Sequence, residues 1–265
     1  MMNSLIVGKY VPGDSFIHRM DPRAKLLLVF AYVLIVFLAN NAFGYVLLGL
    51  YTAVIVFMSK VPFSFILRGL KPVLWIIIIT FILHILMTKE GPVLLELGWL
   101  SIHEGGLIQG IFISFRFFFL ILITTMLTLT TTPIQVTDGM ESLLNPLKRL
   151  KFPVHELALM MSISLRFIPT LMDETDKIIK AQTARGVDFS SGPITDRLKS
   201  IVPLLVPLFI GSFKRAEELA IAMEARGYRG GEGRTKYRKL QWHFPDTVML
   251  LLLAALAASL FIVRS

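Results

Sequence analysis

The sequence predicts an all-α, polytopic membrane protein with about five transmembrane helices and further long helices along the cytoplasmic face of the membrane. Hydrophobic residues make up 55% of the 265 residues and charged residues only 17%, whereas soluble domains are about 45–50% apolar and about 25% charged. Long apolar runs recur along the chain, and the connections between them alternate between basic and non-basic. Because the sequence contains no cysteine, disulfides, zinc-thiolate sites and thiol catalysis are excluded.

Five apolar runs are predicted to span the membrane, because a helix needs about 20 mostly apolar residues to cross the hydrocarbon core. The first run follows the sequence DPRAK and is expected to stay as an anchor, since no signal-peptide pattern precedes it. It is a little short, and it is joined to the second run by Asn40 and Asn41, which predicts a tight helical hairpin. The predicted spans cover residues 24–40, 42–58, 70–87, 107–129 and 247–263.

The distribution of Lys and Arg predicts how these spans are oriented. The N-terminal arm carries Lys9, Arg19, Arg23 and Lys25, and the connection after the second span is also basic. The alternate connections carry either no charge or one lysine against three glutamates. By the positive-inside rule, the N-terminus is therefore cytoplasmic and the C-terminus external. The same bias accounts for the net charge of +9, so no nucleic-acid partner is predicted.

This orientation predicts four spans in the first region of the chain, a basic cytoplasmic region, and one C-terminal span. The three regions are residues 1–131, 132–241 and 242–265. The cytoplasmic region contains two apolar runs, of which the first is interrupted by Arg166 and Pro169 and the second is too short to cross. Both are predicted to form long helices along the membrane face. Pro203 and Pro207 are predicted to bend or break the second helix.

Each of these two helices ends in the same pattern, Ala-x-x-Ala-Arg-Gly. The first copy is AQTARG at 181–186, and the second is AMEARG at 222–227. Glycine after the last helical residue supplies a left-handed cap, and an arginine there complements the helix dipole. One copy would need no further explanation. Two copies also suit docking, because small alanines keep each tip narrow and the guanidinium offers a multi-donor fork to carboxylates in a groove. Capping and docking both remain open from the residues alone.

These motifs, together with GDSFIHRMDPRAK and LNPLKRLKFPVHELALMMSISLRFIPTL, make the chain similar to the transmembrane T component of energy-coupling factor (ECF) transporters. The resemblance runs along nearly the whole chain. It implies a multi-pass subunit of the bacterial cell membrane whose coupling helices fit grooves of two ABC-type ATPases, and which holds a vitamin- or micronutrient-binding S component. The ATPase-binding residues that it implies are Ala184, Arg185, Gly186, Ala225, Arg226 and Gly227.

Catalytic and metal-binding patterns are not found in the sequence. No Gly-x4-Gly-Lys-Ser/Thr occurs, so ATP and Mg²⁺ are expected on the partner ATPases and no cofactor on this chain. The run HELAL resembles the start of a zinc-protease helix, but Leu159 stands where the second histidine belongs. The five histidines are scattered over different segments, which predicts packing or interfacial roles rather than a metal site.

Four further residues are candidates for subunit contact or hinge motion. Arg116 lies inside the fourth predicted span, and an intramembrane charge is costly enough to suggest a function. A structural role in the helix bundle is the alternative. Pro169, Pro203 and Pro207 are candidate hinges, since kinked helices at the membrane face would suit a mechanical coupler.

Two other kinds of protein remain as alternatives. A conventional ABC importer permease also docks on ATPases, but through one loop per chain, and its pathway would need polar residues that these spans offer sparingly. An integral membrane lipid enzyme would need a reactive cluster. The nearest candidate is Asp173, Glu174 and Asp176, whose spacing suits a solvated helix face better.

Overall fold

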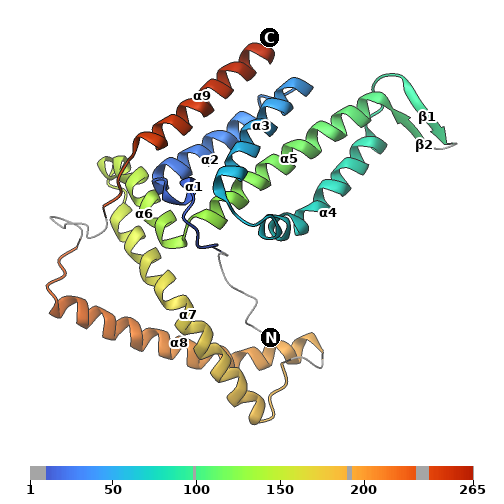
Figure 1. The fold of residues 1–265 in the computed structure, drawn as a ribbon. Helices are drawn as coiled ribbons and strands as arrows, with labels where there is room; N and C mark the ends of the chain where they lie inside the picture. Colours follow the sequence, from blue (N-terminus) through green and yellow to red (C-terminus); the bar gives the residue numbers. More distant parts are fainter. Residues whose placement is uncertain (1–9, 98–99, 190–192, 231–238, 265) are drawn as a thin grey trace. The chain divides into compact units, whose positions relative to one another are not determined.

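The computed structural model confirms the all-α fold class, because most of the residues that it describes are helical (Figure 1). The structure describes residues 10–97, 100–189, 193–230 and 239–264. Its elements in chain order are α1 (Phe16–Arg19), α2 (Pro22–Val36), α3 (Ala42–Ser59), α4 (Phe63–Met87), β1 (Val93–Leu97), β2 (Leu100–His103), α5 (Glu104–Thr130), α6 (Pro133–Leu144), the 3₁₀ helix η1 (Asn145–Leu150), α7 (Val154–Ala184), α8 (Ile194–Ala225) and α9 (Phe244–Arg264).

The chain divides into two compact units. Unit 1 comprises Met1–Leu143 and Lys239–Ser265, and unit 2 comprises Leu144–Arg238. Unit 1 therefore includes α6, because Gly139 of α6 lies against Pro22 and Leu26 of α2. By these contacts the first unit extends beyond the predicted boundary after residue 131. Which residues of the chain lie at the membrane boundary stays a prediction.

The core of unit 1 is formed by α2, α3, α5 and α9 (Figure 1), and α2 and α3 each contact both α5 and α9. Each contributes a fully buried apolar side chain: Tyr32, Leu48, Ile123 and Leu253. The one polar group that Tyr32 brings into this core is satisfied, because its hydroxyl pairs with Thr52 Oγ1 at 2.5 Å. Helix α4 packs along α5 but leaves most of its apolar surface exposed, as expected of a helix that faces lipid.

Among the described residues, five helices are long and apolar enough to cross a membrane: α3, α4, α5, α7 and α9. The predicted number of five is confirmed, but the set differs: α7, which was predicted to lie along the membrane face, has the length and composition of a span, and the first predicted span does not. The first predicted span forms α2, which has 15 residues and is about 22 Å long at 1.5 Å per residue. It ends early because Phe37, Leu38 and Ala39 donate to carbonyls three residues back, which tightens the chain into the turn before α3.

A two-stranded antiparallel hairpin, β1–β2, joins α4 to α5, and it was not predicted from the sequence. The strands pair Val93 with His103 and Leu97 with Leu100. Gly91 precedes the hairpin with a φ of +83°, which an L-residue adopts only with strain. The hairpin therefore closes the α4–α5 connection without altering the helical fold class.

Unit 2 consists of η1 and the long helices α7 and α8, which cross each other (Figure 1). Pro203 and Pro207 were predicted to bend or break their helix. They do not break it, because α8 continues through both of them for 32 residues, and a bend there stays a prediction. Pro169 likewise lies inside an unbroken α7. Each proline removes one N–H from the helical ladder and frees the carbonyl four residues before it, while the remaining bonds keep the helix intact.

Candidate functional site

The first Ala-Arg-Gly sequence forms a Schellman motif at the end of α7. Ala184 is the last helical residue, Arg185 is the C-cap, and Gly186 follows with a φ of +87°. The Gly186 N–H donates to Thr183 O at 3.0 Å, and the Val187 N–H donates to Gln182 O at 3.0 Å. This pair of bonds satisfies carbonyls that the helix end would otherwise leave free.

The second Ala-Arg-Gly sequence repeats the same geometry at the end of α8. Arg226 is the C-cap, and Gly227 has a φ of +75°. The Gly227 N–H donates to Glu224 O at 2.8 Å, and the Tyr228 N–H donates to Met223 O at 3.0 Å. The two helix ends are thus alike in backbone as well as in sequence, and we call them the ARG tips.

The glycines of the ARG tips are needed for their backbone angle and not for space. A Cβ placed on Gly186 or on Gly227 meets no heavy atom within 4 Å in the part of the chain that the structure describes. We therefore expect Gly186→Ala and Gly227→Ala each to lower the free energy of unfolding by about 1 kcal/mol, from left-handed strain alone. Thermal unfolding of the purified variants measures this. A loss of several kcal/mol at either glycine would show that the surroundings of the tip are packed.

The arginine side chains take no part in these caps. The Schellman bonds use only backbone groups, so the glycine explains the helix end whichever residue precedes it. Arg185 and Arg226 are both exposed, and within the described residues neither guanidinium has an ion pair or a side-chain hydrogen bond. Capping thus accounts for the glycine but leaves the arginine available, which favours docking.

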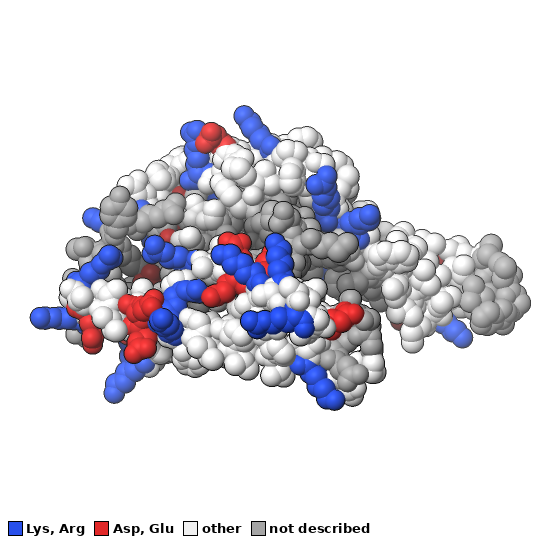
Figure 2. Space-filling model, turned by 90° about the horizontal axis from the view of Figure 1, so that it is seen from below, with Lys and Arg blue, Asp and Glu red and all other residues white. Residues whose placement is uncertain are grey.

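The surface around the ARG tips carries charges of both signs. On α7 the charged stretch before the tip contains Asp173, Asp176, Lys177 and Lys180, and α8 has a comparable stretch of lysine and glutamate. Figure 2 shows basic and acidic side chains interspersed on the face that it draws. Such a mixed pattern suits a protein partner with its own charged groups better than a polyanion.

Two polar contacts hold α7 and α8 together where they cross. Arg215 Nη2 lies 3.0 Å from Glu174 Oε2, and its guanidinium carbon is 5.7 Å from the centre of the Phe167 ring. Closer to the first tip, Gln182 Nε2 donates to the carbonyl of Pro203 at 3.4 Å. That carbonyl has no helical partner, because the residue four positions later is Pro207. The prolines of α8 therefore provide an acceptor for α7.

Between the first half of α7 and the second half of α8 lies an apolar groove with a volume of about 440 Å³. Its lining includes Ile163, Phe167, Leu171, Ser212, Leu219 and Met223. Among the described residues no group of three or more potential metal ligands is found, and Glu174 at the crossing is used in its ion pair with Arg215. The groove offers apolar packing rather than a reactive cluster.

Arg116 serves the helix bundle of unit 1. Its Nη2 donates to the carbonyl of Ala39 at 3.2 Å, and its guanidinium carbon lies 5.4 Å from the centre of the Phe37 ring. Both partners belong to the turn between α2 and α3. The arginine therefore closes the end of α2 against α5, and a role in subunit contact stays a prediction.

A family model described as "Cobalt transport protein" (CbiQ) matches residues 13–237. The chain is 68% identical to the energy-coupling factor transporter transmembrane protein EcfT of Bacillus subtilis over 265 residues, covering all of both chains. It is 58% identical to EcfT of Listeria innocua, again covering all of both chains. EcfT of Exiguobacterium sibiricum is 55% identical over 98% of this chain and 99% of its own length.

The candidate spans and these comparisons therefore place the chain in the class of multi-pass membrane transport proteins. Within this class, the chain belongs to the family of EcfT, the transmembrane components of ECF transporters. The paired Ala-Arg-Gly motifs indicated the same family, and that prediction is confirmed.

Proposed function

We propose that this chain is the coupling subunit through which two ABC-type ATPases drive the uptake of a vitamin or similar micronutrient. The observation that carries the proposal is the pair of ARG tips, which present the same exposed arginine on the same Schellman backbone. Two equivalent tips match two equivalent grooves, and a pair of related ATPases would provide one groove each. Binding at one tip then raises the effective concentration for binding at the other.

The α7–α8 pair suits the transmission of force. Its helices run unbroken through their prolines and are joined by the Arg215–Glu174 ion pair and the Gln182–Pro203 hydrogen bond. A displacement at either tip would therefore move the crossing as well. The chain itself is non-catalytic in this proposal, since ATP and Mg²⁺ are bound by the ATPases, and the substrate by a membrane-embedded S component.

A conventional importer permease remains the second candidate. The number of docking elements argues against it, because such a permease offers one per chain and this chain has two ARG tips. The exposed apolar faces of α4 and α8 are available for lipid and for the S component. A permease that forms its own pathway would instead be expected to line it with polar residues.

Purification of the tagged chain from its bacterial membrane tests the proposal. We expect two ATPases and a small membrane protein to co-purify, and the complex to hydrolyse ATP. The isolated chain should show no ATPase activity, because its sequence lacks a phosphate-binding loop. Hydrolysis that persists in the pure chain after any contaminating ATPase is removed would contradict the proposal, as would a complex without ATPases.

The proposed orientation places the ARG tips in the cytoplasm and the β1–β2 hairpin outside the cell. Single cysteines report on this directly, since the native chain has none. We expect Lys89→Cys to react with an impermeant maleimide added outside intact cells, and Lys180→Cys to react only in inverted vesicles. Both positions are exposed in the structure. The reverse pattern of labelling would overturn the proposed topology.

A further inference from the structure

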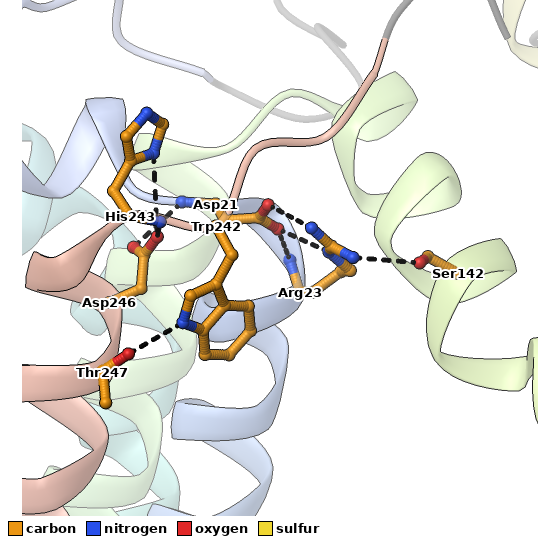
Figure 3. Close-up of polar contacts among 7 residues, drawn as sticks. All are labelled: Asp21, Arg23, Ser142, Trp242, His243, Asp246 and Thr247. Carbon is orange, nitrogen blue, oxygen red and sulfur yellow. Dashed lines mark hydrogen bonds and ion pairs between the residues drawn. The ribbon is translucent and has the colours of Figure 1, made fainter.

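Arg23, at the start of α2, lies at the centre of a polar cluster in unit 1 (Figure 3). Its Nε and Nη2 donate to the two carboxylate oxygens of Asp21 at 3.0 and 2.8 Å. The Asp21 side chain is fully buried and also accepts the Arg23 backbone N–H at 2.8 Å, so that it caps α2. The hydrogen bonds that Arg23 donates to Asp21 raise the pKa of Arg23 further above its usual value, and the guanidinium stays charged.

The remaining faces of the Arg23 guanidinium contact two segments that are far apart in sequence. Its Nη1 donates to Ser142 Oγ in a long hydrogen bond of 3.5 Å, and its carbon lies 5.8 Å from the centre of the Trp242 ring. The second contact is within the range of a cation–π interaction. Trp242 is itself oriented by its indole N–H, which donates to Thr247 Oγ1 at 2.8 Å.

These two segments are the connections between unit 1 and unit 2. Ser142 lies just before Leu143, where the first part of unit 1 ends, and Trp242 lies shortly after Lys239, where the chain returns to unit 1. The Arg23 side chain thus contacts both the segment that leads out of unit 1, at Ser142, and the segment that returns to it, at Trp242.

A buried carboxylate fixes the returning segment to the same place. Asp246 is fully buried, and its Oδ1 and Oδ2 accept the backbone N–H groups of Asp21 at 3.1 Å and of His243 at 2.8 Å. On the outgoing side, α6 lies so close to α2 that a Cβ on Gly139 would come within 2.9 Å of Leu26 Cδ1. Arg23 therefore lies between two segments that are each held independently against α2.

We infer that Arg23 is a positioning residue that joins the two connections to unit 2, so that displacement of α7 and α8 is passed to the helices of unit 1. Without Arg23, the outgoing and returning segments move independently and absorb part of the displacement. This inference rests on the proposed function. It concerns the amount of substrate transported per ATP. Replacement of Arg23 should leave docking at the ARG tips and ATP hydrolysis unchanged.

The test compares Arg23→Gln with Arg19→Gln in the complete complex of this chain, two ATPases and an S component that binds riboflavin. Arg19 is an exposed arginine of the neighbouring helix α1, and the structure gives it no side-chain partner among the described residues. In proteoliposomes, uptake of radiolabelled riboflavin is measured together with ATP hydrolysis. We expect Arg23→Gln to retain both ATPases and hydrolysis but to lose about tenfold in riboflavin transported per ATP. A ratio equal to that of Arg19→Gln overturns the inference.

A second pair of variants covers the case in which Arg23→Gln does not assemble. Trp242→Leu removes the ring that Arg23 contacts, at a side chain that is 43% exposed, while Thr247→Val removes only the hydrogen bond to the indole. We expect Trp242→Leu to lower riboflavin transported per ATP, and Thr247→Val to lower it by less, because the ring stays but loses the hydrogen bond that orients it. Equal ratios for these two variants overturn the inference.

Combining the substitutions and restoring the charge test whether Arg23 and Trp242 act through one junction. The double variant Arg23→Gln/Trp242→Leu should be no worse than Arg23→Gln alone, because both changes break the same contact. Arg23→Lys should restore part of the ratio, since it keeps the charge. Additive losses, or no recovery with Lys, would contradict a shared junction. A wild-type complex that contains no ATPases rejects the proposed function itself, whatever the Arg23 variants do.

Discussion

Replacing both Arg185 and Arg226 with Glu is expected to release both ATPases from the complex and to abolish transport. Both arginines are exposed and unpaired within the described residues, so each is free to meet a carboxylate in a partner groove. Removal of one partner from such a desolvated charge pair costs about 2–5 kcal/mol, or about 30- to 4,000-fold in affinity. Glu also places like charges opposite each other.

The single variants separate the two ARG tips. Arg185→Glu or Arg226→Glu alone should weaken assembly strongly, because the avidity that two tips provide is lost with either of them. Lysine at either position should rescue only in part, since it keeps the charge but not the planar fork of donors. Lys214→Glu, on the exposed surface of α8, provides a matched charge reversal outside the tips.

Co-purification of the ATPases and uptake in membranes measure these effects. Folding should be unaffected, because neither arginine side chain contributes to its Schellman motif. If the folded double variant keeps both ATPases and full transport, the arginines do not dock and the tips are helix caps only.

Asp246→Leu is expected to cause the largest loss of stability in unit 1. The substitution leaves the Asp21 and His243 backbone N–H groups without their acceptor and removes a charge that lies close to the buried Lys25. Removal of one member of such a buried charged network costs about 3–5 kcal/mol. Asp246→Asn keeps one acceptor oxygen and should cost distinctly less. Thermal unfolding of the purified chain in detergent measures both values.

Asp14→Leu provides the control for this prediction. Asp14 is exposed, and the structure gives its side chain no partner among the described residues. We expect its substitution to change the free energy of unfolding by less than about 0.5 kcal/mol. Similar unfolding temperatures for Asp246→Leu and Asp14→Leu would show that the buried cluster contributes little to stability.

The ARG tips could be predicted in detail because every part of the signal is local. Glycine after a helix permits the left-handed angle that Gly186 and Gly227 adopt, and the repeated arginine is visible in the sequence itself. The spans α3, α4, α5 and α9 were predictable for a similar reason, since apolar length alone identifies them.

Features that depend on contacts between distant residues could not be predicted in this way. Asp246 and the Asp21 N–H that it accepts are 225 positions apart, and nothing in either local sequence indicates that they meet. The early end of α2 depends on a short run of tightened hydrogen bonds after Val36, in residues as apolar as the helix itself. The prolines of α8 indicate a bend or a break by local rules, and a helix this long keeps enough hydrogen bonds to avoid the break.

Cross-linking from each ARG tip tests the central claim most directly. Because the chain has no cysteine, Ala184→Cys and Ala225→Cys each introduce a single reactive site beside an arginine, at exposed positions. A short thiol-to-amine cross-linker applied to the complex, followed by mass spectrometry, identifies the partner at each tip. The account predicts that both tips link to ATPase subunits and that the links disappear in the double Glu variant. Links from either tip only to the S component, or to no protein, would contradict it.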